Sequence, residues 1–183
     1  MTLADDILNF WYEPGEPRIR QDWFQRSDTF DQEIRDRFFG EYERAVAGDH
    51  DALAATPRGA LALIIMLDQF PRNLFRDDAR AYATDAKAMS LAATAVGQGH
   101  DAELNWMERL FLYMPYQHAE DLVLQERSVA LFTSLANADS LQSAIKHHDI
   151  VKRFGRFPHR NQVLGRPSTP DEVAFLAEHG RGF

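Results

Sequence analysis

Two short stretches of this sequence share one pattern, Phe-Pro followed by Arg-Asn. The first is QFPRN at residues 69–73, and the second is RFPHRN at residues 156–161, which carries a histidine before the arginine. An arginine guanidinium offers a planar fork of donors that matches a carboxylate or a phosphate, and an asparagine amide can both donate and accept. The two stretches therefore predict a polar pocket for a small anion, built from Arg72, Asn73, His159, Arg160 and Asn161.

A carboxylate is expected to be buried beside the first stretch. Asp68 lies near the C-terminal end of an apolar helix predicted over residues 57–69, where the helix dipole disfavours negative charge. This position costs on the order of 0.3–1 kcal/mol unless a cation compensates. Asp68 should therefore pair with an arginine, either as a structural salt bridge or as a group that orients a ligand. The candidate partners are Arg72, Arg76, Arg153 and Arg160.

The acidic stretch YQHAEDLVLQERS, residues 116–128, supplies further polar groups. On a helix, Asp121 and Gln125 fall beside a stripe of leucines, so both are expected to face inward or to line a groove. His118 lies just before this helix, and His148 shares a face with apolar residues of the next helix. The predicted ligand-binding set is therefore completed by Asp68, His118, Asp121, Gln125 and His148.

The histidines do not predict a metal site. His147 and His148 are adjacent, so they point in different directions on a helix, and no histidine has a ligand at the i, i+4 spacing of helix-borne zinc sites. The chain also has no cysteine, no Gly-rich phosphate loop, no nucleophile elbow and no dinucleotide fingerprint. We therefore expect no metal and no cofactor, and the sequence leaves open whether the pocket is catalytic.

Charge and hydropathy exclude several classes of partner. The 183-residue chain carries 20 Lys+Arg against 28 Asp+Glu, a formal net charge of −8 that disfavours nucleic acid as the main partner. The longest apolar run, ALALIIML at residues 60–67, is far too short to cross a bilayer, and the N-terminus lacks the basic start of a signal peptide. We expect one cytoplasmic domain over residues 1–183, with neither nucleic acid nor membrane as a partner.

Helical periodicity dominates the chain, and no segment predicts a strand. Pro71 and Pro115 are expected to end the helices before them, and residues 13–17 to form a turn. The apolar helix with ALALIIML should be the buried centre. An all-α domain of about eight helices, stacked as antiparallel hairpins, satisfies this pattern. The helices are expected over residues 3–12, 30–47, 57–69, 81–96, 104–113, 120–136 and 141–154, and from the capping box at 169–172 onward. Gly48 is expected to end the second of these helices and Thr56 to cap the third. Trp23 and Phe24 lie outside a clear helix and are possible walls of a groove.

Four stretches together resemble a bacterial family, domain-of-unknown-function family 924. They are LDQFPRNLFR, AYATDAKA, ERLFLYMPYQHAEDLVLQERSV and HHDIVKRFGRFPHRNQVLGRPSTPDEVAFL. The resemblance covers essentially the whole chain and implies an all-α, tetratricopeptide-like fold of stacked helix pairs, but no activity. One departure is Ala119, where members of the family often have a serine. A ligand contact through that hydroxyl would be absent here.

Three classes of function remain open at this point. The first is a binding or catalytic site for a small anionic metabolite, such as a carboxylate or a phosphate, at the two Arg-Asn corners. The second is a tetratricopeptide-like module whose groove takes a peptide. The third is a purely structural network in which the polar groups pair with one another. An open pocket with both corners on its wall would favour the first class over the third, and an exposed apolar groove would favour the second.

Overall fold

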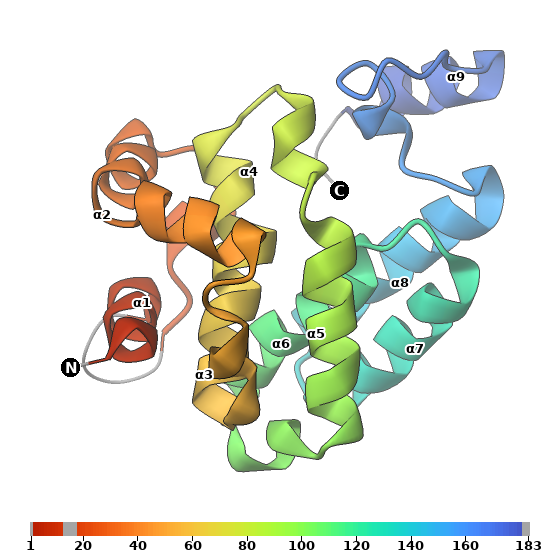
Figure 1. Ribbon diagram of the computed structural model, residues 1–183. Coiled ribbons are helices and arrows are strands. Elements are labelled where there is room, and N and C mark those ends of the chain that lie inside the picture. Colours follow the sequence, from red (N-terminus) through yellow and green to blue (C-terminus); the bar gives the residue numbers. More distant parts are fainter. Residues whose placement is uncertain (1, 13–17, 181–183) are drawn as a thin grey trace.

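The computed structural model describes residues 2–12 and 18–180, and every regular element within these residues is helical (Figure 1). The predicted all-α class is therefore confirmed. A π-helical turn, Ile65–Gln69, joins α3 and α4 into one rod, so the described chain holds about the eight helices expected. The turn expected over residues 13–17 lies outside the described residues. The α-helices are α1 (Leu3–Tyr12), α2 (Asp28–Ala47), α3 (Pro57–Ile64), α4 (Phe70–Leu74), α5 (Asp85–Gly97), α6 (Trp106–His118), α7 (Leu122–Thr133), α8 (Ala138–Phe154) and α9 (Pro170–His179).

Local signals in the sequence set several helix boundaries. Thr56 and Thr169, both expected as caps, accept the backbone N–H groups of Gly59 and Glu172. The Glu172 carboxylate in turn accepts the N–H of Thr169, which completes the predicted capping box. Gly48, the expected stop of α2, has a φ of 98°, a left-handed conformation that glycine adopts without strain.

Pro71 and Pro115 lie inside helical segments rather than ending them, so these two predictions are wrong. A proline lacks an N–H, and its ring crowds the carbonyl four residues earlier, which for Pro71 is that of Leu67. The π-helical turn widens the backbone here, and the Leu67 carbonyl accepts the hydroxyl of Thr84 at 2.5 Å instead. α6 is buried on nearly all sides around Pro115, and this packing outweighs the local cost of the proline. The helix therefore continues to His118.

The helix with ALALIIML is the buried centre of the fold, as predicted. Residues 60–67 are at most 1% exposed. In Figure 1, α3 lies between α1 and α2 on one side and α5 and α6 on the other. At the far end of the π-helical turn, the Phe70 ring packs 5.3 Å from Phe38, 5.8 Å from Trp11 and 6.4 Å from Phe10, measured between ring centroids. The aromatic residues of the first third of the chain thus form the core around this turn.

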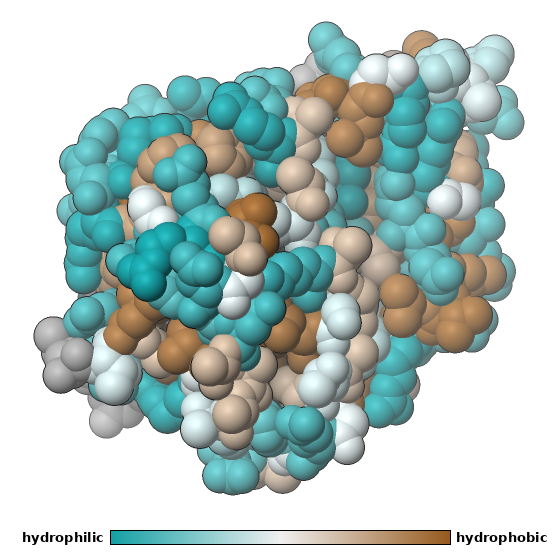
Figure 2. Space-filling view, in the orientation of Figure 1, coloured by the Kyte–Doolittle hydropathy of each residue, from teal (hydrophilic) through white to brown (hydrophobic). Residues whose placement is uncertain are grey.

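The helices from α5 to α8 pack each against the next in chain order, as stacked hairpins require. The tetratricopeptide-like arrangement of the pairs stays a prediction. The molecular face in Figure 2 is polar over most of its area, with small separate apolar patches. In the described part of the chain, no helix combines the length and the apolar character that crossing a bilayer requires. A second, smaller core holds α9 and is formed by Ile150, Val151, Phe157 and Phe175.

Gly59 and Gly40 provide a matched pair of substitutions that tests the packing of α3. A Cβ on Gly59 would lie 2.1 Å from the backbone oxygen of Leu53, whereas a Cβ on Gly40 would meet no atom within 4 Å. We expect Gly59→Ala to lower the free energy of unfolding by about 1–3 kcal/mol through steric strain. Gly40→Ala should raise it by about 0.5–1 kcal/mol, because alanine is the better helix former. Urea denaturation followed by circular dichroism measures both, and equal stabilities would contradict the tight approach at Gly59.

Candidate functional site

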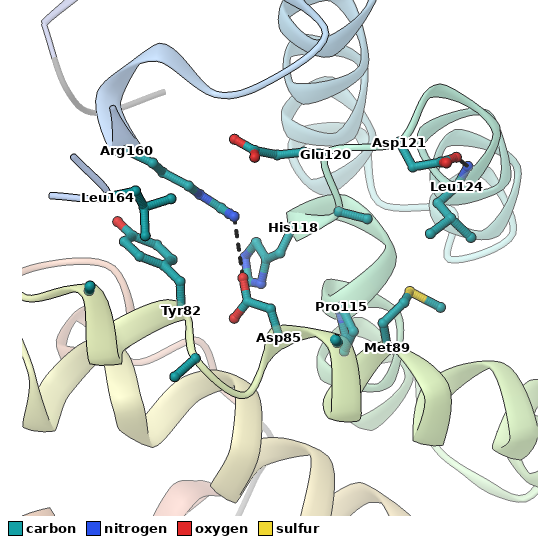
Figure 3. Close-up of a pocket in the computed structure, with 14 residues that line it drawn as sticks. Tyr82, Asp85, Met89, Pro115, His118, Glu120, Asp121, Leu124, Arg160 and Leu164 are labelled. Carbon is teal, nitrogen blue, oxygen red and sulfur yellow. Dashed lines mark hydrogen bonds and ion pairs between the residues drawn. The ribbon is translucent and has the colours of Figure 1, made fainter. Parts of the chain in front are cut away.

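A pocket of about 550 Å³ lies where α5, the α6–α7 junction and the second Phe-Pro corner meet (Figure 3). Its apolar wall includes Met89, Pro115, Leu124 and Leu164. Figure 3 shows the side chains of Arg160, His118 and Asp85 directed toward one another inside it. The polar lining comes from three separate stretches of the chain and consists of Tyr82, Asp85, His118, Glu120, Asp121 and Arg160.

The two arginines of the repeated pattern converge on one carboxylate, that of Asp85 in the first turn of α5. Arg72 Nη1 lies 2.9 Å from Asp85 Oδ1, and Arg160 Nη1 donates to Asp85 Oδ2 at 3.2 Å. Arg72 also donates to the backbone oxygen of Ala81 at 2.8 Å, so its position is fixed from two sides. The resemblance between the two stretches thus corresponds to a spatial meeting of their arginines.

The two asparagines of the pattern lie away from the pocket and have structural partners. Asn73 Nδ2 donates to Asp31 Oδ1 of α2 at 2.8 Å. Asn161 is fully buried, and its Oδ1 accepts Arg166 Nε at 3.0 Å while its Nδ2 donates to Ser168 Oγ at 3.1 Å. Neither residue is among those that line the pocket. Of the two stretches, only Arg160 lines the pocket, and Arg72 contributes through its ion pair with the lining residue Asp85.

Arg160 is held between two aromatic rings. The side chain is 7% exposed, and its Cζ lies 4.6 Å from the ring centroids of both Tyr82 and Phe157. Burial lowers the pKa of Arg160, and repulsion from Arg72 adds to this effect. Within the described residues, Nη1 donates to Asp85, while Nε has no hydrogen-bond partner and no bond is made by Nη2. A desolvated guanidinium with unused donors is suited to receive an anion.

Asp68 is buried, as expected, and its arginine partner is Arg72 at 3.4 Å. A second partner was not among those predicted: both carboxylate oxygens lie 2.9 Å from His118 Nδ1. Burial alone would raise the pKa of Asp68, but the charges of His118 and Arg72 outweigh it and lower the pKa to about 2. Asp68 is therefore ionised at neutral pH. The other three candidates have partners elsewhere: Asp31 for Arg76, Asp85 for Arg160, and the Phe154 ring for Arg153.

Asp121 does not face inward but lines the rim of the pocket, which is the second of the two positions predicted for it. Its side chain is exposed at the rim, where it caps α7 by accepting the N–H of Leu124 at 3.0 Å. Gln125 is buried as expected, but its amide donates to the backbone oxygens of Gln117 and Ala119, both at 2.7 Å. It therefore holds the α6–α7 junction in shape instead of lining the pocket.

The remaining predicted histidines also lie outside the pocket. His148 Nδ1 pairs with its neighbour Asp149 at 2.9 Å. His159 packs against the Phe157 ring at 5.7 Å between centroids, and burial lowers its pKa to about 3. No group of three His, Cys, Asp or Glu side chains within residues 2–12 and 18–180 is placed to hold a metal ion.

Tyr82, Asp85 and Glu120 are the polar pocket residues that the sequence did not indicate. Glu120 forms a two-point ion pair with Arg166, at 2.5 and 2.9 Å, and accepts the backbone N–H of Phe157 at 2.7 Å. Asp85 could be recognised from the sequence as an acidic residue in the first turn of α5. Because acidic residues occur at the start of many helices, this position does not indicate a binding site. Neither carboxylate has its partners nearby in the sequence, so no local pattern identifies them.

A second pocket, of about 390 Å³, borders the same ion pairs from another direction. His118 and Arg72 line it together with Met114, Phe132, His147 and other residues. Trp23 and Phe24, predicted as possible groove walls, are also part of its lining. His118 is therefore shared by both pockets.

Comparisons with known proteins agree with the resemblance seen in the sequence. Residues 7–180 match the model of a family described as bacterial protein of unknown function, DUF924. A solved structure of a protein of unknown function from Agrobacterium tumefaciens is 41% identical, covers 96% of this chain and 97% of its own, and superposes with a TM-score of 0.90. No protein with a curated description matches significantly. The chain therefore belongs to the DUF924 family of bacterial proteins.

Proposed function

We propose that the 550 Å³ pocket binds a small metabolite through an anionic group, a carboxylate or a phosphate, that contacts Arg160. The observation that carries this proposal is the state of Arg160 itself. Its guanidinium is buried between two rings and uses one nitrogen on Asp85, while the other two nitrogens have no hydrogen-bond partner in the described chain. Nε has almost no accessible surface, so the nitrogen that can meet a ligand is Nη2, and an anion bound there would gain a charge-assisted hydrogen bond.

The charges around the pocket support an anion rather than a cation. The carboxylates of Asp68, Asp85 and Glu120 are matched by the guanidiniums of Arg72, Arg160 and Arg166. Each of these carboxylates already accepts hydrogen bonds from its cation or from backbone N–H groups, so little accepting capacity is left for a cationic ligand. Arg160 keeps unused donors, and the accepting groups that remain are Asp121 at the rim, Nε2 of His118 and Asp85 Oδ1, which lies 2.9 Å from Arg72 Nη1 without a hydrogen bond.

The test is calorimetric titration of the protein with inorganic phosphate and with small carboxylates. Arg160→Gln should weaken binding at least about tenfold, because one charge-assisted hydrogen bond contributes about 1.5–3 kcal/mol. Asp85→Asn should strengthen binding on the order of tenfold, since it removes the carboxylate that competes for Arg160. Arg127→Gln, on the exposed face of α7, is the control and should leave binding unchanged.

An anion site predicts opposite changes in anion affinity, a decrease for Arg160→Gln and an increase for Asp85→Asn. A structural network predicts instead that both substitutions only destabilise the fold and that no anion binds to the wild type. The peptide-binding alternative stays a prediction. Its one supporting feature is the pair Ile19 and Phe24, which are 52% and 60% exposed and line the second pocket.

A further inference from the structure

We propose that His118 is the proton-transfer group of this pocket and that Asp68 is the residue that positions it. This inference rests on the proposed function, because the anion at Arg160 is what would bring a ligand beside the imidazole. Figure 3 shows the His118 ring next to the Arg160–Asp85 pair, on the inner side of the pocket. The substrate class is a small carboxylate- or phosphate-bearing compound that has a hydroxyl group or a bond cleaved by water.

The Asp68 carboxylate determines which nitrogen of His118 carries the proton. An ionised carboxylate can only accept hydrogen bonds, and both of its oxygens lie 2.9 Å from Nδ1. Nδ1 must therefore be the donor, which leaves Nε2 of the neutral ring with a free lone pair. The Asp68 side chain is 1% exposed and that of His118 is 16% exposed, so the imidazole is the more accessible member of this pair.

Nε2 is available to a ligand. Within the described residues it has no hydrogen-bond partner, although His118 Nδ1 has two contacts to Asp68. The His118 side chain is 16% exposed and lines both pockets. A histidine whose Nδ1 is fixed by a buried carboxylate and whose Nε2 faces a cavity has the geometry of a general base.

Several contacts hold Asp68 and His118 in place. Asp68 is fixed by the π-helical turn, by Arg72 and by the side-chain amide of Gln69 at 2.5 Å. π-helical turns of this kind occur frequently at functional sites. His118 is the last residue of α6, so its ring lies at the negative end of the helix dipole. Gln125 holds the carbonyl groups of this same helix end.

The step assigned to His118 is a proton transfer. The O–H bond of a ligand hydroxyl or of water breaks, its electron pair stays on the oxygen, and a new N–H bond forms at Nε2. The imidazolium charge is balanced by Asp68, and the proton returns to the ligand or to solvent at the end of the step. The described lining of the pocket contains no Ser, Thr or Cys, and its one hydroxyl side chain, Tyr82, packs its ring on Arg160. The proposed step therefore uses a hydroxyl of the ligand or water.

The tautomer of His118 tests the inference directly in the wild-type protein. Long-range ¹H–¹⁵N correlation spectra, recorded where the ring is neutral, should show Nδ1 protonated and Nε2 unprotonated. His50 is the internal control, because in this residue Nε2 rather than Nδ1 faces a carboxylate, that of Glu41 at 2.6 Å. The neutral ring of His50 should therefore carry its proton on Nε2. The His118→Gln spectrum assigns the signal. The charged and titratable groups near His118 that also affect its protonation are Asp68, Arg72, Asp85, Glu120, His147, His159 and Arg160.

Two perturbations complete the experiment. Asp68→Asn should abolish the Nδ1–H tautomer of His118 and leave His50 unchanged, because an amide no longer requires a donor at Nδ1. Inorganic phosphate should shift the Nε2 resonance of His118 in the wild type but not in Arg160→Gln. A neutral His118 with its proton on Nε2, or phosphate that binds at Arg160 without moving this resonance, would overturn the role of His118 alone. Absence of any phosphate or carboxylate binding would overturn the proposed function and this role together.

Discussion

Replacing Asp68 with alanine should lower the free energy of unfolding by about 3 kcal/mol. Asp68 is completely buried, and its removal leaves His118 Nδ1 and the Gln69 amide without their acceptor and Arg72 with one carboxylate instead of two. Removing one partner of a buried pair typically costs about 3–5 kcal/mol, and the remaining ion pair of Arg72 with Asp85 keeps the expected value at the lower end. Urea denaturation at neutral pH measures it.

Asp68→Asn separates the charge of this residue from its shape. The pKa of Asp68 is lowered from 3.8 to about 2 in the folded protein, so its charge stabilises the fold above about pH 4, and this contribution is lost as the pH falls toward 2. The difference in stability between wild type and Asp68→Asn should therefore narrow across that range. Asp36→Asn, on the exposed face of α2, is the matched control and should change stability by less than about 0.5 kcal/mol at any pH. A difference in the free energy of unfolding between wild type and Asp68→Asn that stays constant between pH 4 and pH 2 would show that the Asp68 charge does not stabilise the fold.

Phe70→Ala should destabilise the protein by about 3–5 kcal/mol, the range for a large aromatic side chain removed from a close-packed core. The Phe70 side chain has no exposure and packs against the rings of Phe38, Trp11 and Phe10. It directly follows the π-helical turn, so its packing holds α1 and α2 against the segment that carries Asp68. Phe70→Leu keeps most of the volume and should cost less than about 1.5 kcal/mol.

Phe24→Ala is the control for this substitution. Phe24 is also a phenylalanine from the first third of the chain, but its side chain is 60% exposed. Its replacement should therefore change the free energy of unfolding by no more than about 0.5 kcal/mol. Thermal unfolding followed by circular dichroism compares the variants. Equal losses for Phe70→Ala and Phe24→Ala would mean that the core is not organised around the π-helical turn.

The fold was predictable where its cause is local. The caps at Thr56 and Thr169 and the stop at Gly48 depend on residues within a few positions of one another, and each lies where the sequence indicates. The continuation of the helix through Pro71 was not predictable in this way. It depends on a π-helical turn whose freed carbonyl at Leu67 is satisfied by Thr84, a residue of another element. Proline rules describe the isolated helix and do not include such a partner.

The same distinction between local causes and contacts of distant elements applies to the candidate site. The sequence by itself determined the all-α class, the buried central helix, the need of Asp68 for a cation, and the two arginines of the repeated pattern, because helix periodicity, dipole and guanidinium chemistry act over a few residues. Only the tertiary structure decided that Asp85 joins Arg72 to Arg160 and that His118 binds Asp68. It also decided that Asn73, Asn161 and His148 have structural partners elsewhere and that Asp121 caps α7 at the rim of the pocket. The physical reason is that a buried charge must find its partner in space, and the packing of helices from distant parts of the chain, rather than any local pattern, determines which partner lies within hydrogen-bond distance.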